Sequence, residues 1–246
     1  MDRFLRRALA LCLAALPVSC GGGDEPEFPP VTPTRIDRAK TGSIQGHAVF
    51  RGAPPQNRPI VMGTPECKRL HADQPLDEKV LVRDGDLQNA FVFIRKGLDG
   101  IVYEHVRTPV TIDNRGCFYH PRVCGVRPYQ PVTFLNSDPM LHNVQCGEAG
   151  FNKMLPGPGS AATVQFREPY RLNTLRCSIH TWMVGHVWTI PHPHFAVTAA
   201  DGGFRIPDVP EGKYELEAWH EVLGTRAAAV HVTAGGTAVA EFDFTP

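Results

Sequence analysis

Short segments in which apolar and polar residues alternate run along the chain from about residue 42 to its end. Residues 43–50 read Ser-Ile-Gln-Gly-His-Ala-Val-Phe, and this period of two is typical of a strand with one buried face. The same kind of pattern predicts strands at residues 79–83, 88–95, 101–106, 109–112, 122–127, 131–135, 141–145, 162–166, 172–176, 185–190, 195–198, 204–206, 213–220, 227–232 and 238–244. Turns rich in Gly and Pro, 23 of each in the chain, separate these segments, and no helical period interrupts them. We therefore predict an all-β protein with little helix.

The beginning of the chain has a different pattern. Three Arg among the first seven residues precede an apolar run at residues 8–16, which is too short to span a bilayer. This order of charge and apolar residues is typical of an export signal, so residues 1–19 are predicted to be a signal peptide.

The residues around Cys20 resemble the lipobox of bacterial lipoproteins, in which the cysteine becomes the lipidated first residue. Pro17 stands where that pattern prefers an aliphatic residue, so ordinary signal cleavage stays open as an alternative. Residues 20–41 carry few large apolar groups and are predicted to be a disordered tether. The resemblance implies a periplasmic or cell-surface bacterial lipoprotein, held to its membrane by a lipid on Cys20.

Composition excludes several classes of function. The chain has 246 residues, which is enough to bury a core without a cofactor. Lys plus Arg and Asp plus Glu are equal at 25 each, so no overall positive field attracts nucleic acid, and no nucleic-acid partner is expected. No P-loop, dinucleotide fingerprint or nucleophile motif is present. We do not expect an enzyme.

The seven cysteines comprise three with separate assignments and a set of four. Cys12 would leave with the signal peptide, Cys20 is the lipidation candidate, and Cys177 lies in a motif described below. The remaining four form an even set in a chain predicted to enter an oxidising compartment: Cys67, Cys117, Cys124 and Cys146. Two disulfides are expected, with three possible connectivities. We favour Cys67–Cys117 and Cys124–Cys146, on the idea that the second pair lies on strands flanking the loop of Cys177.

Metal-ligand residue types occur together at Cys177-x-x-His180-x-x-Met183, between two predicted strands. A Cys-x-x-His pair alone is weak evidence, because it is also half of a zinc site. A second element strengthens it: a predicted strand, an Asn-Ser-Asp-Pro turn and His142 at the start of the next strand. Two imidazoles, a thiolate and a thioether suit both copper(I) and copper(II), whereas zinc seldom uses methionine. We predict one copper ion as the cofactor.

These residues resemble the cupredoxins, which use a histidine from an Asn…His-Asn-Val strand entry and a later Cys-His-Met loop, and the short gap between His180 and Met183 resembles amicyanin. The resemblance implies a Greek-key barrel with a type 1 copper site. It implies Cys177 as the dominant electron-donating ligand, His142 and His180 as nitrogen ligands, and Met183 as the weak axial ligand. His180, near the loop tip, is expected to be exposed and to be the point at which electrons enter and leave.

His220 is a further candidate. It is interpreted either as an additional or replacement metal ligand or as a hydrogen-bonded histidine packed beside Trp219.

The C-terminal part has a motif of its own. Residues 198–216 read T-x-x-D-G-x-F-x-I-x-x-V-P-x-G-x-Y-x-L, which resembles the carboxypeptidase regulatory-like module, a transthyretin-like β-sandwich. The strands that normally open such a module resemble residues 42–49 and 89–94, far upstream. This implies a discontinuous sandwich of residues 42–100 and 194–246, with the copper domain of residues 101–193 inserted. Two consecutive domains divided near Pro193 remain the alternative.

The chain as a whole resembles a bacterial family of exported plastocyanin-like and methylamine-utilisation-type proteins. The motifs that carry this resemblance lie at residues 177–183, 195–204 and 219–224. One departure is that His120 precedes Pro121, where the family tends to place Pro first.

The resemblance implies electron transfer with a redox partner protein, such as a c-type cytochrome or a periplasmic oxidoreductase. Periplasmic copper storage or delivery, and a surface β-sandwich interaction module with a vestigial metal site, remain as alternatives.

Overall fold

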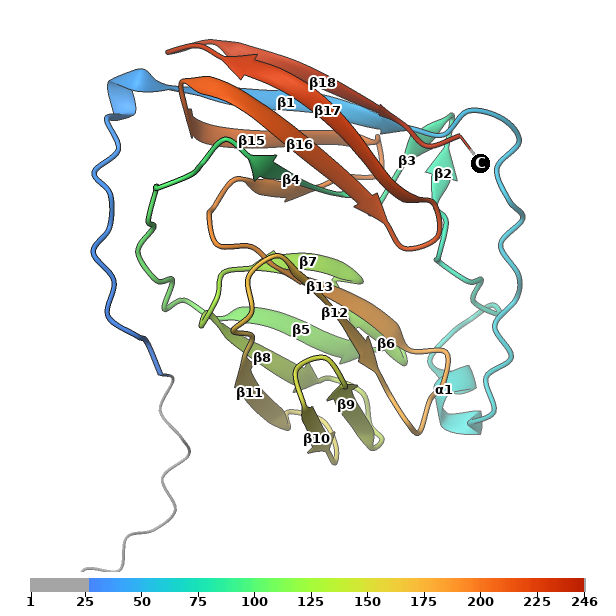
Figure 1. Ribbon diagram of the computed structural model, residues 1–246. Helices are drawn as coiled ribbons and strands as arrows, with labels where there is room; N and C mark the ends of the chain where they lie inside the picture. Colours follow the sequence, from blue (N-terminus) through green and yellow to red (C-terminus); the bar gives the residue numbers. More distant parts are fainter. Residues whose placement is uncertain (1–26, 246) are drawn as a thin grey trace, which may run out of the picture.

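The computed structural model describes residues 27–245, so the predicted signal peptide 1–19 and Cys20 lie outside the described residues. The described chain is all-β, as predicted, with one five-residue helix, α1 (Pro65–Arg69), and a 3-10 turn at Arg38–Lys40. Among the described residues, no helix is long and apolar enough to cross a bilayer. Four sheets form two sandwiches, which Figure 1 shows one above the other.

Strands from both ends of the described chain build the first pair of sheets, here named the terminal sandwich. One sheet contains β1 (Thr41–Val49), β2 (Val82–Arg83), β3 (Asp86–Leu87), β15 (Gly203–Pro210) and β18 (Thr237–Asp243). The other contains β4 (Phe91–Lys96), β14 (Phe195–Val197), β16 (Gly212–His220) and β17 (Gly224–Val232). Strand β1 lies between β15, its antiparallel neighbour, and β18, its parallel neighbour. Apolar side chains that alternate along these strands, such as Ile44, Ile206 and Phe242, meet between the sheets in a fully buried core.

The middle of the chain builds the second pair of sheets, here named the central sandwich. One sheet has the order β10 (Phe151–Leu155), β9 (His142–Cys146), β12 (Arg171–Arg176), β13 (Val184–Thr189) and β7 (Val123–Val126). The other has the order β11 (Ala161–Gln165), β8 (Pro131–Asn136), β5 (Val110–Arg115) and β6 (Phe118–His120). Both sheets are mixed, because β13 pairs with β7 and β5 pairs with β8 in parallel. Because β1 and β4 pair with C-terminal strands, residues 42–100 and 194–246 contribute strands to the same sheets. The division of the chain into domains stays a prediction.

Aromatic rings join the two sandwiches. Trp188 of β13 stacks on Phe91 of β4 with 5.9 Å between ring centroids, and Trp219 of β16 meets Trp188 edge-on at 5.8 Å. Beside these rings the guanidinium of Arg122 donates two hydrogen bonds to the carboxylate of Glu221, at 2.6 and 2.8 Å, and both side chains are buried. A paired charge is therefore enclosed between the sandwiches, where an unpaired one would be costly.

Two parts of the predicted secondary structure are wrong. Residues 101–106 form no strand but lie alongside residues 27–37. The backbone N–H groups of Thr34 and Val102 each donate a hydrogen bond to the other residue, and the guanidinium of Arg107 lies over the ring of Phe28, 4.3 Å from its centroid. The same contacts hold this part of the predicted tether against the protein. Three strands, β3, β6 and β10, were not predicted, because each is only two to five residues long and follows a tight turn.

The structure contains the expected disulfide between Cys67 and Cys117, but the second expected pairing is wrong. Cys124 lies on β7 and Cys146 on β9, and both are buried free thiols. The β12–β13 hairpin separates these two strands in the sheet, so three strand spacings of about 4.8 Å each intervene. A disulfide needs Cα atoms within about 7 Å of each other. The hairpin that carries the predicted metal loop thus keeps the two thiols apart.

The Arg122–Glu221 pair leads to a prediction about stability and pH. Burial by itself would raise the pKa of Glu221, but hydrogen bonds from His186 and Arg122 lower it to about 2. Because the folded state holds this carboxylate ionised, its stabilising effect is complete above pH of about 4.5 and is lost as the pH falls towards 2. We expect Glu221→Gln to lower the free energy of unfolding of the metal-free chain by about 3 kcal/mol at pH 7, because it leaves Arg122 buried without its partner.

Urea unfolding at pH 7 and at lower pH measures the difference in free energy of unfolding between the wild type and Glu221→Gln. This difference is expected to become smaller between pH 4.5 and 2, as the carboxyl of Glu221 in the wild type takes up its proton. The matched control is Glu215→Gln, since Glu215 pairs with Lys96 at 3.0 Å on the exposed surface. The control should change stability by less than about 1 kcal/mol. Equal losses in the two variants would contradict the role given to the buried pair.

Candidate metal centre

The loop from Cys177 to Met183 joins β12 to β13 and lies beside the start of β9. Its ends are closed by two backbone hydrogen bonds, from Met183 N–H to the His180 carbonyl at 2.9 Å and from Cys177 N–H to the Met183 carbonyl at 3.4 Å. Strands β9 and β12 are antiparallel, with Arg176 opposite Gln145. The loop that follows β12 therefore runs alongside β9 towards His142, the first residue of that strand.

Three of the predicted ligands meet at one point. The Nδ1 atoms of His142 and His180 are 3.0 Å apart, and the Sγ atom of Cys177 lies 3.8 Å from Nδ1 of His180. One ligand atom from each of the three residues lies within 4.8 Å of the others, and all three side chains are buried. Donors that share an ion at 2.0–2.3 Å have about this separation from one another. Met183, the fourth predicted ligand, is fully buried in the core cluster that also contains Cys177.

Asp138 holds His142 in the orientation that ligation requires. Its carboxylate accepts a hydrogen bond from Nε2 of His142 at 2.9 Å and from the backbone N–H groups of Gly116 and Cys117 at 2.7 and 2.8 Å. Because the Nε2 proton is used by Asp138, the lone pair of Nδ1 is free to face His180 and Cys177. Metal-binding histidines generally have such a partner on the second nitrogen.

Asn143 fixes the other side of the loop. Its Oδ1 atom accepts hydrogen bonds from the backbone N–H and the hydroxyl of Ser178, at 2.8 and 3.0 Å, and from the Cys177 thiol at 3.3 Å. Its amide nitrogen donates to Asn152 on β10 at 2.8 Å. The residue after Cys177 is thus held to β9 whether or not the thiol carries its proton.

The surroundings of the three residues shift the pKa of each. Burial alone would raise the pKa of Cys177, but a hydrogen bond with His142 and nearby backbone N–H groups lower it below its ordinary value. For His142, burial acts to lower the pKa, yet hydrogen bonds with Asp138 and Cys177 raise it. Burial and the neighbouring His142 both lower the pKa of His180. The pKa shifts of Cys177 and His180 are thus both in the direction of the forms that bind metals, a thiolate and a neutral imidazole.

The expected exposure of His180 is wrong. Only 1% of its surface is accessible, and Trp182 lies against it with 5.3 Å between ring centroids. The Trp182 indole in turn donates to the Cys117 carbonyl at 3.1 Å, and the sulfur atoms of Cys67 and Cys117 lie within 4.8 Å of a His180 ring nitrogen. The helix α1, which carries Cys67, and the disulfide therefore cover the side of the site that the sequence led us to expect at the surface.

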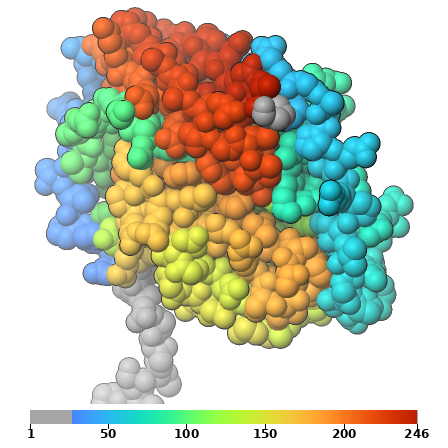
Figure 2. All heavy atoms as spheres, turned by 45° about the vertical axis from the view of Figure 1, so that its right-hand side comes forward, coloured from blue at the N-terminus to red at the C-terminus, as the bar shows by residue number. Residues whose placement is uncertain are grey.

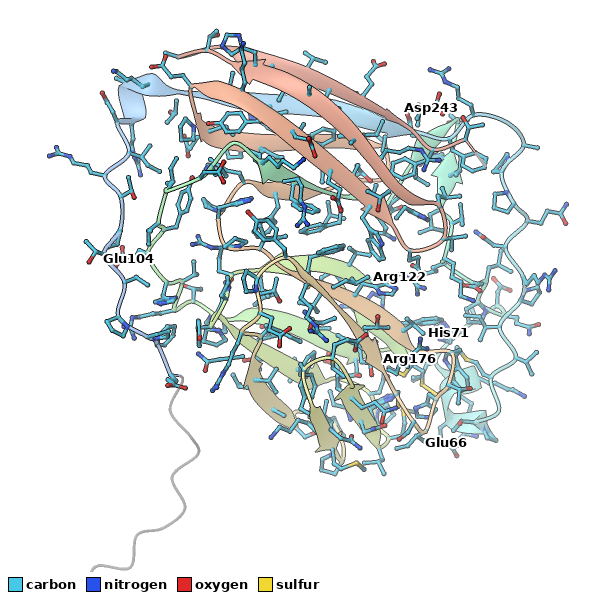
Figure 3. All side chains as sticks on the ribbon, in the orientation of Figure 1. Glu66, His71, Glu104, Arg122, Arg176 and Asp243 are labelled. Carbon is cyan, nitrogen blue, oxygen red and sulfur yellow. A yellow bond between two sulfur atoms is a disulfide. The ribbon has the colours of Figure 1, made fainter. Side chains whose placement is uncertain are left out.

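This cover is part of a longer segment. Figure 2 shows residues 51–81 as a band along one side of the molecule, next to the part of the chain that contains β12 and β13. In Figure 3, Glu66 of α1 and His71, which follows it, lie at the end of the central sandwich. His71 is held there by a 2.8 Å hydrogen bond with the Gly116 carbonyl.

The structure does not bring His220 to the metal centre. Among the described residues, no group that could hold a metal includes it. It ends β16 in the terminal sandwich, where its Nδ1 atom accepts hydrogen bonds from the N–H groups of Val222 and Leu223 at 3.3 Å, and its ring packs near Phe244. His220 is thus a buried residue of the β16–β17 turn, which corrects the interpretation as an additional ligand.

Sequence reasoning missed three contributors to the site. Asp138 and Asn143 stand within the quoted turn and strand entry, but their roles depend on which atoms face the cluster. A carboxylate four residues before the candidate histidine was the one available signal for Asp138. The position of the Cys67–Cys117 disulfide beside His180 has no sequence signal, because Cys67 is more than 100 residues from the loop.

Comparisons with known proteins gave matches among solved structures only, since no family model and no curated protein matched. The copper-containing nitrite reductase from Thermus scotoductus SA-01 is 22% identical over 37% of this chain and 24% of its own length, with a TM-score of 0.29. This chain thus spans about a quarter of that enzyme. The purple cupredoxin from Nitrosopumilus maritimus is 25% identical over 32% of this chain and 98% of its own, with a TM-score of 0.29. A reduced amicyanin variant is 20% identical over 40% of this chain and 97% of its own, with a TM-score of 0.30. At such TM-scores the proposals below rest on the geometry of the site.

The role of Asp138 can be tested by metal affinity. We expect Asp138→Asn to weaken copper binding by about 10- to 100-fold, because an amide placed there turns an NH₂ group towards His142 or towards the two backbone donors. Competition with a chelator of known affinity measures the change.

Asp113→Asn is the matched control for this substitution. The carboxylate of Asp113 accepts a hydrogen bond from the hydroxyl of Ser137, which is the residue before Asp138, and this bond is exposed to solvent. The amide oxygen of an asparagine can accept the same hydrogen bond. Equal copper affinities of Asp138→Asn and Asp113→Asn would contradict the role of Asp138 in orienting His142.

Proposed function

We propose that this protein binds a single copper ion through His142, Cys177 and His180, with Met183 as a weak fourth ligand, and transfers electrons through it. The observation that carries the proposal is the buried convergence of two imidazole nitrogens and one thiol sulfur within 4.8 Å. The loop that supplies Cys177 and His180 also supplies Met183, which is completely buried and lies in the same core cluster as Cys177.

The donor set favours copper over zinc. Thiolate, imidazole and thioether ligands suit both oxidation states of copper, whereas structural zinc sites use four Cys or His ligands. Bound copper would supply one-electron chemistry. The part of the protein is to hold the ligands in one arrangement, which Asp138 does for His142 and Asn143 does for the loop after Cys177. Because both anchors are buried, the ligands would move little when the oxidation state changes.

We further propose that the central sandwich is a cupredoxin-type domain and that the protein is a carrier rather than an enzyme. Two mixed sheets enclose the ligands, and the order His142, Cys177, His180, Met183 is that of the cupredoxin motif. Four protein donors would leave no position for a substrate on the metal. The terminal sandwich is proposed to be of the carboxypeptidase regulatory-like type, on the basis of its motif at residues 198–216.

Copper storage or delivery is the second candidate. It is favoured by one observation, the complete burial of His180 beneath the disulfide, because electron exchange is faster when a ligand reaches the surface. The same four ligands would hold copper(I) in this role.

The spectrum of the copper(II)-loaded chain distinguishes these functions. For an electron-transfer site we expect one copper per chain, an intense thiolate-to-copper band in the visible region and loss of this band in Cys177→Ser. Metal analysis, visible absorption and paramagnetic resonance on the same sample measure this. Cys124→Ser is the control, since this free thiol lies on β7, outside every candidate metal group of the described residues, and its removal should leave the band unchanged.

Each other outcome has a defined meaning. A colourless chain that binds only copper(I) would favour delivery. A chain that binds no copper, and whose stability does not respond to copper, would favour an interaction module with a vestigial site and would overturn both copper functions.

We also propose that the protein is exported and tethered to a membrane by a lipid on Cys20, with a membrane-associated redox protein as its partner. A disulfide among the described residues supports an oxidising compartment. A radioactive fatty acid supplied to a bacterial host should label the wild-type chain and Cys12→Ser but not Cys20→Ser. Label retained by Cys20→Ser would contradict the anchor.

A further inference from the structure

A second group of metal-binding atoms lies beside the proposed centre. The sulfur atoms of Cys67 and Cys117 and a ring nitrogen of His180 are within 4.8 Å of one another, and all three residues are buried. In the structure the two sulfurs form a disulfide and are therefore not ligands. Only His180 belongs to both groups, so the two groups share one imidazole.

The two cysteines belong to parts of the molecule that are held differently. Cys117 is in the β5–β6 turn, where its backbone N–H is bonded to the buried carboxylate of Asp138. Cys67 is on α1, within a segment that has no long strand between β1 and β2. A pocket of about 340 Å³ lies within this segment and is lined only by its own residues, Ile60, Met62, Lys68 and residues 71–75. With one five-residue helix and no long strand, the segment that carries Cys67 is held by few backbone pairings, which permits local opening around the disulfide.

We propose that the Cys67–Cys117 pair, when reduced, is an entry site for copper(I) with His180 as its third ligand. This inference rests on the proposed copper function of the neighbouring centre. An external dithiol supplies the two electrons: the bond between the cysteine sulfurs breaks, a disulfide forms in the dithiol, and its two protons pass to the cysteines. Binding of copper(I) then displaces these two protons into solvent.

The chemistry of the group selects the ion. Two thiolates and one imidazole are soft donors that satisfy copper(I), which accepts three ligands, whereas zinc requires a fourth. Because His180 is common to both groups, an ion that leaves the two thiolates of the entry site is already beside the imidazole that adjoins Cys177 and His142. An external disulfide then reoxidises the two cysteines: its S–S bond breaks, it takes up their two electrons and two protons to become a dithiol, and the Cys67–Cys117 bond forms again. This leaves the entry site without its sulfur donors and retains copper in the inner centre.

The test uses the full chain with Cys12 and Cys20 replaced by serine, so that no thiol outside the described residues contributes. In this chain, Cys177→Ser removes the thiolate of the inner centre. Copper(I) is titrated without oxygen against a chromogenic copper(I) chelator, before and after reduction of the disulfide with a dithiol that is then removed. We expect the reduced form to bind one copper(I) at least tenfold more tightly than the oxidised form. X-ray absorption at the copper edge should give two sulfur ligands and one nitrogen ligand.

Two matched variants decide the assignment. With Cys67 and Cys117 both changed to serine, reduction should no longer increase affinity, although Cys124 and Cys146 are still present. His180→Ala should weaken binding by the reduced form at least tenfold and remove the nitrogen ligand from the absorption spectrum. Affinity that does not respond to reduction, or that is unchanged in His180→Ala, would overturn the entry site. The visible band of the oxidised wild-type chain with copper(II) tests the inner centre separately, since it depends on Cys177 and not on reduction.

Discussion

The carboxylate of Asp138 is the group on which the geometry of the site depends. Its hydrogen bonds join the first residue of β9, His142, to the backbone of the β5–β6 turn at Gly116 and Cys117. These elements belong to different sheets of the central sandwich, so one buried charge determines how the two sheets meet at this end. The charge is maintained although burial opposes it, because His142 and the two N–H groups lower the pKa of Asp138. Loss of this carboxylate would therefore affect the proposed ligand His142 and the position of the disulfide together.

The enclosure of the centre follows from the same arrangement. Asp138 holds the turn that carries Cys117, the disulfide holds α1 to that turn, and Trp182 closes the remaining side through its bond to the Cys117 carbonyl. Water is excluded from the ligands, which strengthens every electrostatic interaction among them. A partner that approaches this site would meet the covering segment or the exposed loop residues Ser178, Ile179 and Thr181 rather than the buried side chains of His142, Cys177 and His180.

The sequence predicted local features well and contacts between distant segments poorly. Alternation of apolar residues was sufficient to predict an all-β chain, and ligand chemistry was sufficient to select His142, Cys177 and His180, which the structure brings together. Strands such as β6 and β10 were missed because a strand of three to five residues shows barely one period of alternation. The pairing of Cys124 with Cys146 was wrong because strand order in a sheet is set by the whole topology and not by distance along the chain. For the same reason, nothing in the local sequence of the loop indicated that Cys67 would cover His180.

The position of β1 has a consequence for how the chain folds. Thr237 of β18, on one side of β1, is 194 residues from its partner Ser43, and β15, on the other side, is also distant in sequence. During synthesis β1 can pair at its last residue, Val49, with the nearby Asp86 of β3, but the rest of its length must wait for β15 and β18 near the end of the chain. The strands of the central sandwich are all contributed by residues 110–189, so that its own pairings are complete much earlier. Pairing between distant segments is slow, because loop-closure entropy is lost before contacts compensate for it. The candidate metal centre would accordingly be assembled while most of β1, which has a partner on each side in the finished protein, still exposes both of its edges.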